Sequence, residues 1–147
     1  EYYYDENFLE LIEKDDLLTI GDNYVLFEMS YTQKAFGLEQ TIFKLLSKGY
    51  KPILAHPERY SYMSNDFKKY DKLKDTGVRF QINLNSLAGF YGKKPKLAAK
   101  YLVDNGFVDF LGSDTHSMKY FDSFSKVIYE KTTHDIFENN KIKNNLL

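Results

Sequence analysis

The sequence predicts an α/β fold built on a parallel sheet or barrel, and two observations support this prediction. Short β-rich runs alternate along the chain with helical patterns of about ten residues, an alternation typical of βαβ crossovers. In addition, the β-rich runs end in polar residues, and parallel α/β folds gather their ligands at that end of the strands. The 147 residues contain no linker and no low-complexity segment, so we expect one domain over residues 1–147.

Four strands and three helices account for most of the chain. Apolar runs predict strands at residues 24–29, 51–56, 78–83 and 108–111. Apolar residues at helical spacing predict helices at residues 37–48, 67–77 and 96–105. A glycine stands at the end of each helical pattern, as expected for a helix stop: Gly49, Gly77 and Gly106. The Asn- and Lys-rich tail from about residue 139 is expected to be frayed.

The composition excludes several classes of function. The chain is 43% hydrophobic and 28% charged, so it can build a core. A formal net charge of −1 gives no strongly basic surface, and we expect no nucleic-acid partner. The absence of cysteine excludes a thiolate nucleophile, including the cysteine-based route to tyrosine dephosphorylation. The apolar runs are too short to span a bilayer, so we expect no membrane insertion.

The residues with useful chemistry follow the strands. They are Glu28, His56, Asn83, Asp114 and His116. In an extended chain, residues two apart project to the same side, so Asp114 and His116 are expected to face one pocket. Carboxylate with imidazole suits Mn, Fe or Zn. Taken alone, Asp114 reads equally well as the N-cap of a helix beside a surface histidine.

The run from His56 to Arg59 is a second candidate feature. Pro57 is expected to hold His56 in an extended backbone and so to fix the direction of the imidazole. Arg59 has the fork geometry that binds a phosphate in bidentate fashion. The alternative is a histidine in a turn and a surface arginine. Glu28 follows an apolar run, where a carboxylate either reaches solvent at the strand end or binds a cation. His134 is expected to be a surface histidine.

Several phrases in order resemble one family. They are Glu1-Tyr2-Tyr3, residues 24–30 (YVLFEMS), residues 55–60 (AHPERY), Gln81-Ile82-Asn83 with Ser86-Leu87, Gly89-x-Tyr91-Gly92, and residues 110–116 (FLGSDTH). This pattern is similar to that of the manganese-dependent tyrosine-protein phosphatases of bacterial capsule and exopolysaccharide systems. These enzymes belong to the polymerase-and-histidinol-phosphatase (PHP) superfamily. The resemblance covers roughly residues 1–116.

The resemblance implies a distorted β/α barrel of the TIM-like PHP type, here incomplete, with metals at its C-terminal rim. Glu28 and His56 would bind one metal, Glu1 would bridge it to a second bound by Asp114, and His116 would bind a third. The expected cofactor is Mn²⁺, two or three ions in the complete domain, with Fe or Zn as alternatives. The metals would activate the hydroxide that attacks phosphorus.

The remaining roles implied by the resemblance concern the substrate. Arg59 would bind the phosphate, with Lys119 in place of a second arginine, and Arg59, Asp114 and His116 would be catalytic. The implied substrate is a phosphotyrosine protein, a bacterial tyrosine kinase, in the cytoplasm. A homo-oligomer is a further possibility.

The family also has ligands that this sequence lacks, because a His-x-His pair precedes its Glu-Tyr-Tyr phrase whereas this chain starts at Glu1. With no initiator methionine, the sequence is expected to be the C-terminal part of a longer domain, and weak or inactive alone. Two alternatives stay open. One is another PHP-type phosphoesterase, acting on histidinol phosphate or a small phosphate ester. The other is a non-catalytic binding module.

Overall fold

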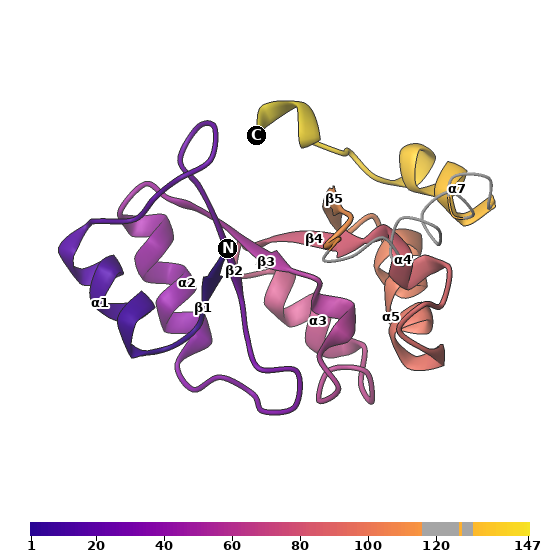
Figure 1. Ribbon diagram of the computed structural model, residues 1–147, viewed down its shortest axis with the longest axis horizontal. Coiled ribbons are helices and arrows are strands. Elements are labelled where there is room, and N and C mark those ends of the chain that lie inside the picture. The colour runs from indigo at the N-terminus through magenta and orange to yellow at the C-terminus, as the bar shows by residue number, and fades with distance from the viewer. Residues whose placement is uncertain (116–126, 128–130) are drawn as a thin grey trace.

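The computed structural model describes residues 1–115, 127 and 131–147. Its framework is a five-stranded parallel sheet in which the strands follow the order of the chain, as Figure 1 shows. The strands are β1 (Tyr2–Tyr3), β2 (Tyr24–Glu28), β3 (Lys51–Ala55), β4 (Arg79–Asn83) and β5 (Val108–Gly112). Because all neighbours are parallel, the carboxyl ends of the strands meet at one edge of the sheet.

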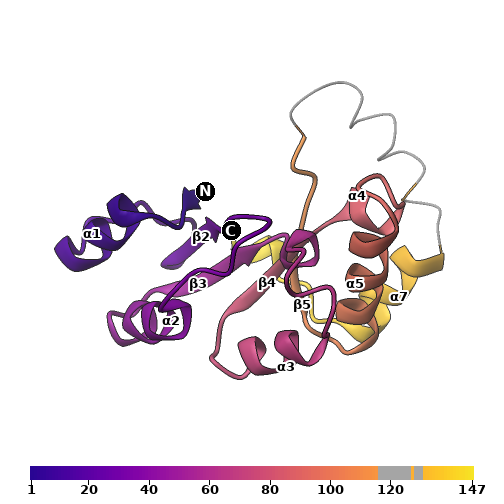
Figure 2. The same ribbon diagram turned by 90° about the horizontal axis from the view of Figure 1, so that it is seen from below.

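The helices that connect these strands lie along the outer side of the curved sheet (Figure 2). They are α1 (Glu6–Lys14), α2 (Leu38–Ser47), α3 (Lys68–Lys74), the short α4 (Leu84–Leu87) and α5 (Lys93–Asp104). Right-handed crossovers that always advance in the same direction put their helices on the same side of a sheet. The arrangement is that of a β/α barrel that has not closed, which confirms the fold predicted from the sequence.

Side chains alternate between the two faces of the sheet, as the period of a strand requires. The helix-facing set forms the main core with the helices; it includes Val25, Phe27, Leu54, Phe80 and Ile82. The opposite face carries a smaller cluster of Tyr24, Ile53 and Phe110, with Leu26 packed against it. Among the described residues, no helix is long and apolar enough to cross a membrane.

The first helix, α1, was not predicted. Asp5 caps it by accepting a hydrogen bond from the backbone N–H of Phe8 at 2.9 Å, and Phe8 and Ile12 are buried. Tyr2 stacks on Phe8 with ring centroids 5.2 Å apart, so the aromatic start of the chain packs into the core. An N-cap aspartate followed by apolar residues at helical spacing was the signal available in the sequence.

The C-terminal segment covers the outer edge of β5. After α7 (Lys131–Asn139), the Asn140 side chain accepts from the N–H of Val108 at 3.0 Å. The Asn144 side chain then pairs with both backbone groups of Leu111, at 2.9 and 2.8 Å. The composition of this tail predicted fraying and gave no sign of these contacts. An exposed strand edge is a site for unwanted pairing, and the asparagine side chains occupy it.

Candidate metal centre

Glu1, Glu28 and His56 meet at the carboxyl edge of the sheet. Glu1 precedes β1, Glu28 is the last residue of β2, and His56 directly follows β3. The Nε2 atom of His56 lies 3.3 Å from Oε1 of Glu1 and 3.3 Å from Oε2 of Glu28. Within the described part of the chain, this is the only group of three acidic or imidazole side chains close enough to share one metal ion. We call it the triad.

The triad has the donor set and the spacing that a divalent cation requires. Two atoms that each bind a cation at about 2.1 Å lie about 3.0–3.4 Å apart in octahedral or tetrahedral geometry. Both distances from Nε2 of His56 fall in this range. His56 is only 2% exposed, and two carboxylates held together beside it repel one another unless a cation joins them. Carboxylate and imidazole donors suit Mn, Fe or Zn.

The backbone at His56 is not extended, so the prediction based on Pro57 was wrong. His56 has φ 35° and ψ 53°, in the left-handed region. Its N–H donates to the carbonyl of Gln81 at 2.7 Å, and its carbonyl accepts from Arg59 at 2.9 Å, which opens a single 3₁₀ turn, η1 (Pro57–Arg59). These two bonds override the local preference of a residue before proline. Such strain in a non-glycine residue is typical of functional sites.

Arg59 contacts two aromatic rings. Its guanidinium carbon lies 4.5 Å from the ring centroid of Tyr31 and 4.2 Å from that of Tyr91. Its Nη1 donates to Oδ2 of Asp114 at 2.6 Å, and the Asn83 side chain donates to the same oxygen at 3.0 Å. We call the two rings the aromatic clamp. The segments that follow β2, β4 and β5 therefore converge on Arg59, which itself follows β3.

Tyr31 connects the aromatic clamp to the triad. Its hydroxyl donates to Oε2 of Glu28 at 3.5 Å, and its ring lies 5.5 Å from the ring of His56. Burial, acting against the nearby Arg59, raises the pKa of Tyr31 to about 12. The hydroxyl therefore stays protonated at neutral pH and remains a hydrogen-bond donor to the carboxylate.

Asp114 lies beside Arg59 rather than in the triad. Its φ of 46° is left-handed, so the prediction that it shares an extended segment with His116 was wrong at this residue. The contacts with Arg59 and Asn83 favour this left-handed backbone conformation at Asp114, because they draw its carboxylate toward β4. His116 and Lys119 lie outside the described residues. The structure thus brings together Glu1, Glu28 and His56, and it joins Arg59 to Asp114.

Sequence reasoning missed Glu58, which is 1% exposed. One of its oxygens accepts from the N–H of Asn83 at 3.0 Å and from the hydroxyl of Ser86 at 2.6 Å. Burial raises the pKa of this carboxyl. The contacts tie η1 to the end of β4, so Glu58 fixes the turn that carries His56 and Arg59. In the sequence, only the position of Glu58 between His56 and Arg59 indicated that it belongs to the site.

An open, five-stranded β/α barrel whose carboxyl edge carries this triad and a clamped arginine defines a class: part of a barrel with a candidate divalent-metal centre. Over residues 1–144 the chain matches the family described as capsular polysaccharide synthesis, CpsB/CapC. The chain belongs to this family, and the resemblance noted in the sequence is confirmed.

Relatives and solved structures agree with this assignment. The chain is 34% identical over 109 residues to the tyrosine-protein phosphatase YwqE of Bacillus subtilis, covering 74% of this chain and 43% of that protein. It is 32% identical over 124 residues to the tyrosine-protein phosphatase CpsB of Streptococcus pneumoniae, covering 80% and 51%. The chain therefore spans about half the length of these curated relatives.

The same two proteins supply the structural comparison. Crystal structures of YwqE from Bacillus subtilis and CpsB from Streptococcus pneumoniae are described as those of unique metal-dependent tyrosine phosphatases. This chain matches a chain from that work with a TM-score of 0.77 and 26% identity, over 97% of this chain and 64% of that one.

Proposed function

We propose that this chain carries the metal- and phosphate-binding part of a metal-dependent phosphatase that removes phosphate from tyrosine side chains. The observation that carries the proposal is the triad at 3.3 Å spacing, joined through Tyr31 to a clamped arginine. Relatives named tyrosine-protein phosphatases support it, as does a family named for capsule synthesis. The substrate we propose is a phosphorylated bacterial tyrosine kinase of the capsule system, in the cytoplasm, where ATP is available.

Glu1, Glu28 and His56 would hold the metal ion, for which we propose Mn²⁺ ahead of Fe or Zn. When bound, a divalent cation supplies a Lewis acid for the phosphoryl oxygens and lowers the pKa of water. The chain's own residues do the rest of the positioning. Tyr31 orients Glu28 by its hydroxyl, and Asp114 would bind a further ion beside the first.

Arg59 would bind the phosphate. A guanidinium has five N–H donors in a fixed plane, and Arg59 contacts Asp114 through Nη1. The edge away from Asp114 can therefore take two phosphate oxygens while the clamp holds the plane. We propose that His116 and Lys119 complete the site as a metal ligand and a second phosphate-binding cation.

The test is hydrolysis of phosphotyrosine and phosphoserine peptides and of histidinol phosphate by the full-length protein, with and without Mn²⁺. We expect metal-dependent release of phosphate from the phosphotyrosine peptide, and a loss of at least about tenfold in kcat/KM for Arg59→Lys, because an ammonium cannot replace the fork. Arg79→Lys is the matched control. Arg79 is the other arginine of the chain, and its guanidinium lies over the Tyr24 ring on β2.

Two results would contradict the proposal. Equal losses of kcat/KM in the two arginine variants would show that Arg59 does not bind the phosphate. Preferential hydrolysis of histidinol phosphate would instead assign the chain to another phosphoesterase of the same superfamily.

A further inference from the structure

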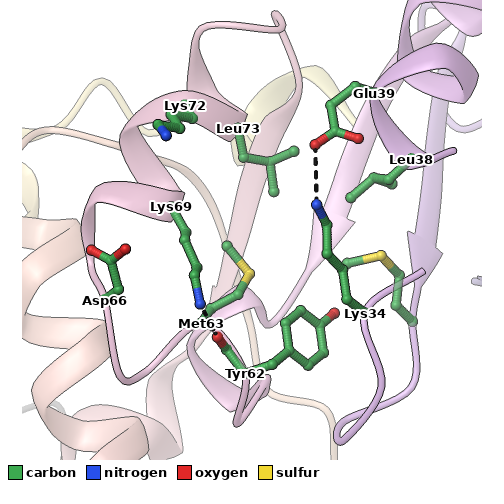
Figure 3. A pocket seen from close by; sticks show the side chains of 10 residues that line it. Lys34, Leu38, Glu39, Tyr62, Met63, Asp66, Lys69, Lys72 and Leu73 are labelled. Atoms are coloured by element: carbon green, nitrogen blue, oxygen red, sulfur yellow. Dashed lines mark hydrogen bonds and ion pairs between the residues drawn. The ribbon is translucent and has the colours of Figure 1, made fainter. Parts of the chain in front are cut away.

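A pocket of about 390 Å³ lies between α2 and α3, next to the segments that follow β2 and β3 (Figure 3). Its apolar surface comes from Met29, Leu38, Met63 and Leu73. Lys34 and Glu39 stand on one side of it, and Lys69 and Lys72 rise from α3 on the other, as Figure 3 shows. We call it the α2–α3 pocket. Ligand pockets commonly have volumes of about 300–1,000 Å³, so its size suits one or two side chains.

The rim of the α2–α3 pocket has a net positive charge on the α3 side, where Lys69 and Lys72 outnumber the single acid, Asp66. Lys34 pairs with Glu39 at 3.5 Å, which balances their charges. Lys69 donates to the backbone carbonyl of Tyr62 at 2.7 Å. Because a carbonyl is neutral, this contact does not balance the positive charge of Lys69. Among the described residues, the side chain of Lys72 has no hydrogen-bond or ion-pair partner. A ligand with a carboxylate therefore complements this side of the pocket.

One polar group inside the pocket needs a partner. The hydroxyl of Tyr62 is buried and has no hydrogen-bond partner among the described residues. Leaving such a group unpaired costs about 1–3 kcal/mol, so a ligand that offers an acceptor gains by binding there. Burial raises the pKa of this hydroxyl, which keeps it a donor at neutral pH.

The α2–α3 pocket is connected to the candidate metal centre. The ring of Tyr62 stacks on that of Tyr60 with centroids 5.8 Å apart, and Tyr60 lies edge-on to His56 at 5.9 Å. The Tyr60 hydroxyl accepts from the N–H of Met29, the residue after Glu28, at 3.1 Å. These two steps set an upper limit on the separation of the Tyr62 and His56 rings, and an extended peptide at about 3.3 Å per residue spans that limit in about four residues.

We infer that the α2–α3 pocket binds a residue pair of the protein substrate, an apolar residue next to an aspartate or glutamate, about four residues from the phosphotyrosine. The apolar side chain would enter between Met63 and Leu73, and its neighbour's carboxylate would meet Lys69 and Lys72. This inference rests on the proposed function, because it assigns the sequence context in which the phosphotyrosine is recognised.

The experiment compares two phosphotyrosine peptides, one with Leu-Glu and one with Gly-Lys placed four residues from the phosphotyrosine. Binding to this chain is measured by fluorescence anisotropy, and hydrolysis is measured with the full-length protein. We expect Lys72→Glu to weaken binding of the Leu-Glu peptide about tenfold and to raise its KM without changing kcat. Hydrolysis of p-nitrophenyl phosphate, which has no peptide to reach the pocket, should not change. Lys68→Glu is the matched control, an exposed lysine of the same helix that does not line the pocket.

A second measurement locates the peptide directly. Two of the three methionines, Met29 and Met63, line the pocket, so ¹³C-methyl spectra should shift at both when the Leu-Glu peptide is added. Equal effects of the two lysine variants, or unshifted methionine signals, would overturn the inference. Self-association of the chain that Lys72→Glu abolishes would also overturn it, by assigning the pocket to a second copy.

The failure of the proposed function would look different. If peptide binding depends on Lys72 but no phosphotyrosine is hydrolysed, the peptide-binding site would be supported and the proposed phosphatase activity would be refuted.

Discussion

Replacing Tyr91 by leucine should weaken phosphate binding, and it should do so only through its effect on Arg59. The ring of Tyr91 lies 4.2 Å from the guanidinium carbon, and the ring of Tyr31 lies 4.5 Å from it. Leucine keeps an apolar side chain at the position but removes the π face. Tyr31 is the less suitable target because its hydroxyl also contacts Glu28. Tyr91→Leu therefore removes one ring of the clamp, together with the edge-on contact between Tyr91 and Phe90, and leaves Tyr31 in place.

The expected size follows from the geometry. The Arg59 side chain is 20% exposed, so it is largely but not fully desolvated. A cation–π contact is worth about 0.5–2 kcal/mol over this range of exposure, and we take about 1 kcal/mol for one of the two ring contacts. This corresponds to about fivefold in affinity, because 1.4 kcal/mol is tenfold. The pair between Arg59 and Asp114 remains and limits the loss.

The assay is titration calorimetry of a non-hydrolysed phosphotyrosine analogue peptide against four proteins: the unchanged chain, Tyr91→Leu, Arg59→Met and the double variant. If Tyr91 acts only by positioning Arg59, it should have no effect once Arg59→Met has removed the guanidinium. A fivefold loss that persists in the Arg59→Met background would refute the clamp, because Tyr91 would then contact the ligand itself.

Two further predictions concern the C-terminal segment. Burial raises the pKa of Asp109, but Lys74, Lys143 and a backbone N–H outweigh it and hold that pKa below 3.8. Asp109→Asn should therefore lower the free energy of unfolding by about 1–3 kcal/mol near pH 7. This contribution is present above pH 3.8 and is lost as the pH falls through the folded pKa, so chemical denaturation should show the two proteins converging in acid; a constant difference would contradict the pairing. Asn144→Ala should free both backbone groups of Leu111, and hydrogen exchange should accelerate at that amide, whereas unchanged exchange would mean that the tail does not protect β5.

The local patterns of the sequence predicted the framework well. Each predicted strand lies within about two residues of an observed one, because apolar runs and terminal glycines are local signals. Gly49, for example, follows α2 with a φ of 85°, which glycine adopts freely. The short β1 was not predicted as a strand because two residues carry no measurable period. It exists because Tyr2 and Tyr3 pair with the end of β2.

The site was predictable as a set of residues but not as an arrangement. Strand ends indicated Glu28 and His56 as neighbours, and the structure places them 3.3 Å apart. The pairing of Arg59 with Asp114 spans 55 positions and depends on how the segment after β5 bends. No local pattern encodes that bend, and none indicates the stacking of Tyr91 on Arg59.

The central claim is that Glu1, Glu28 and His56 together bind a divalent cation, and calorimetric titration of this chain with Mn²⁺ tests it most directly. Glu28→Gln and His56→Gln keep the size of each side chain approximately and should each weaken Mn²⁺ binding well over tenfold, since loss of a direct ligand exceeds the 10–100-fold cost of losing its supporting contacts. His134→Gln, an exposed histidine on α7, should leave binding unchanged. Mn²⁺ binding that survives both triad variants, or that falls equally with His134→Gln, would contradict the account.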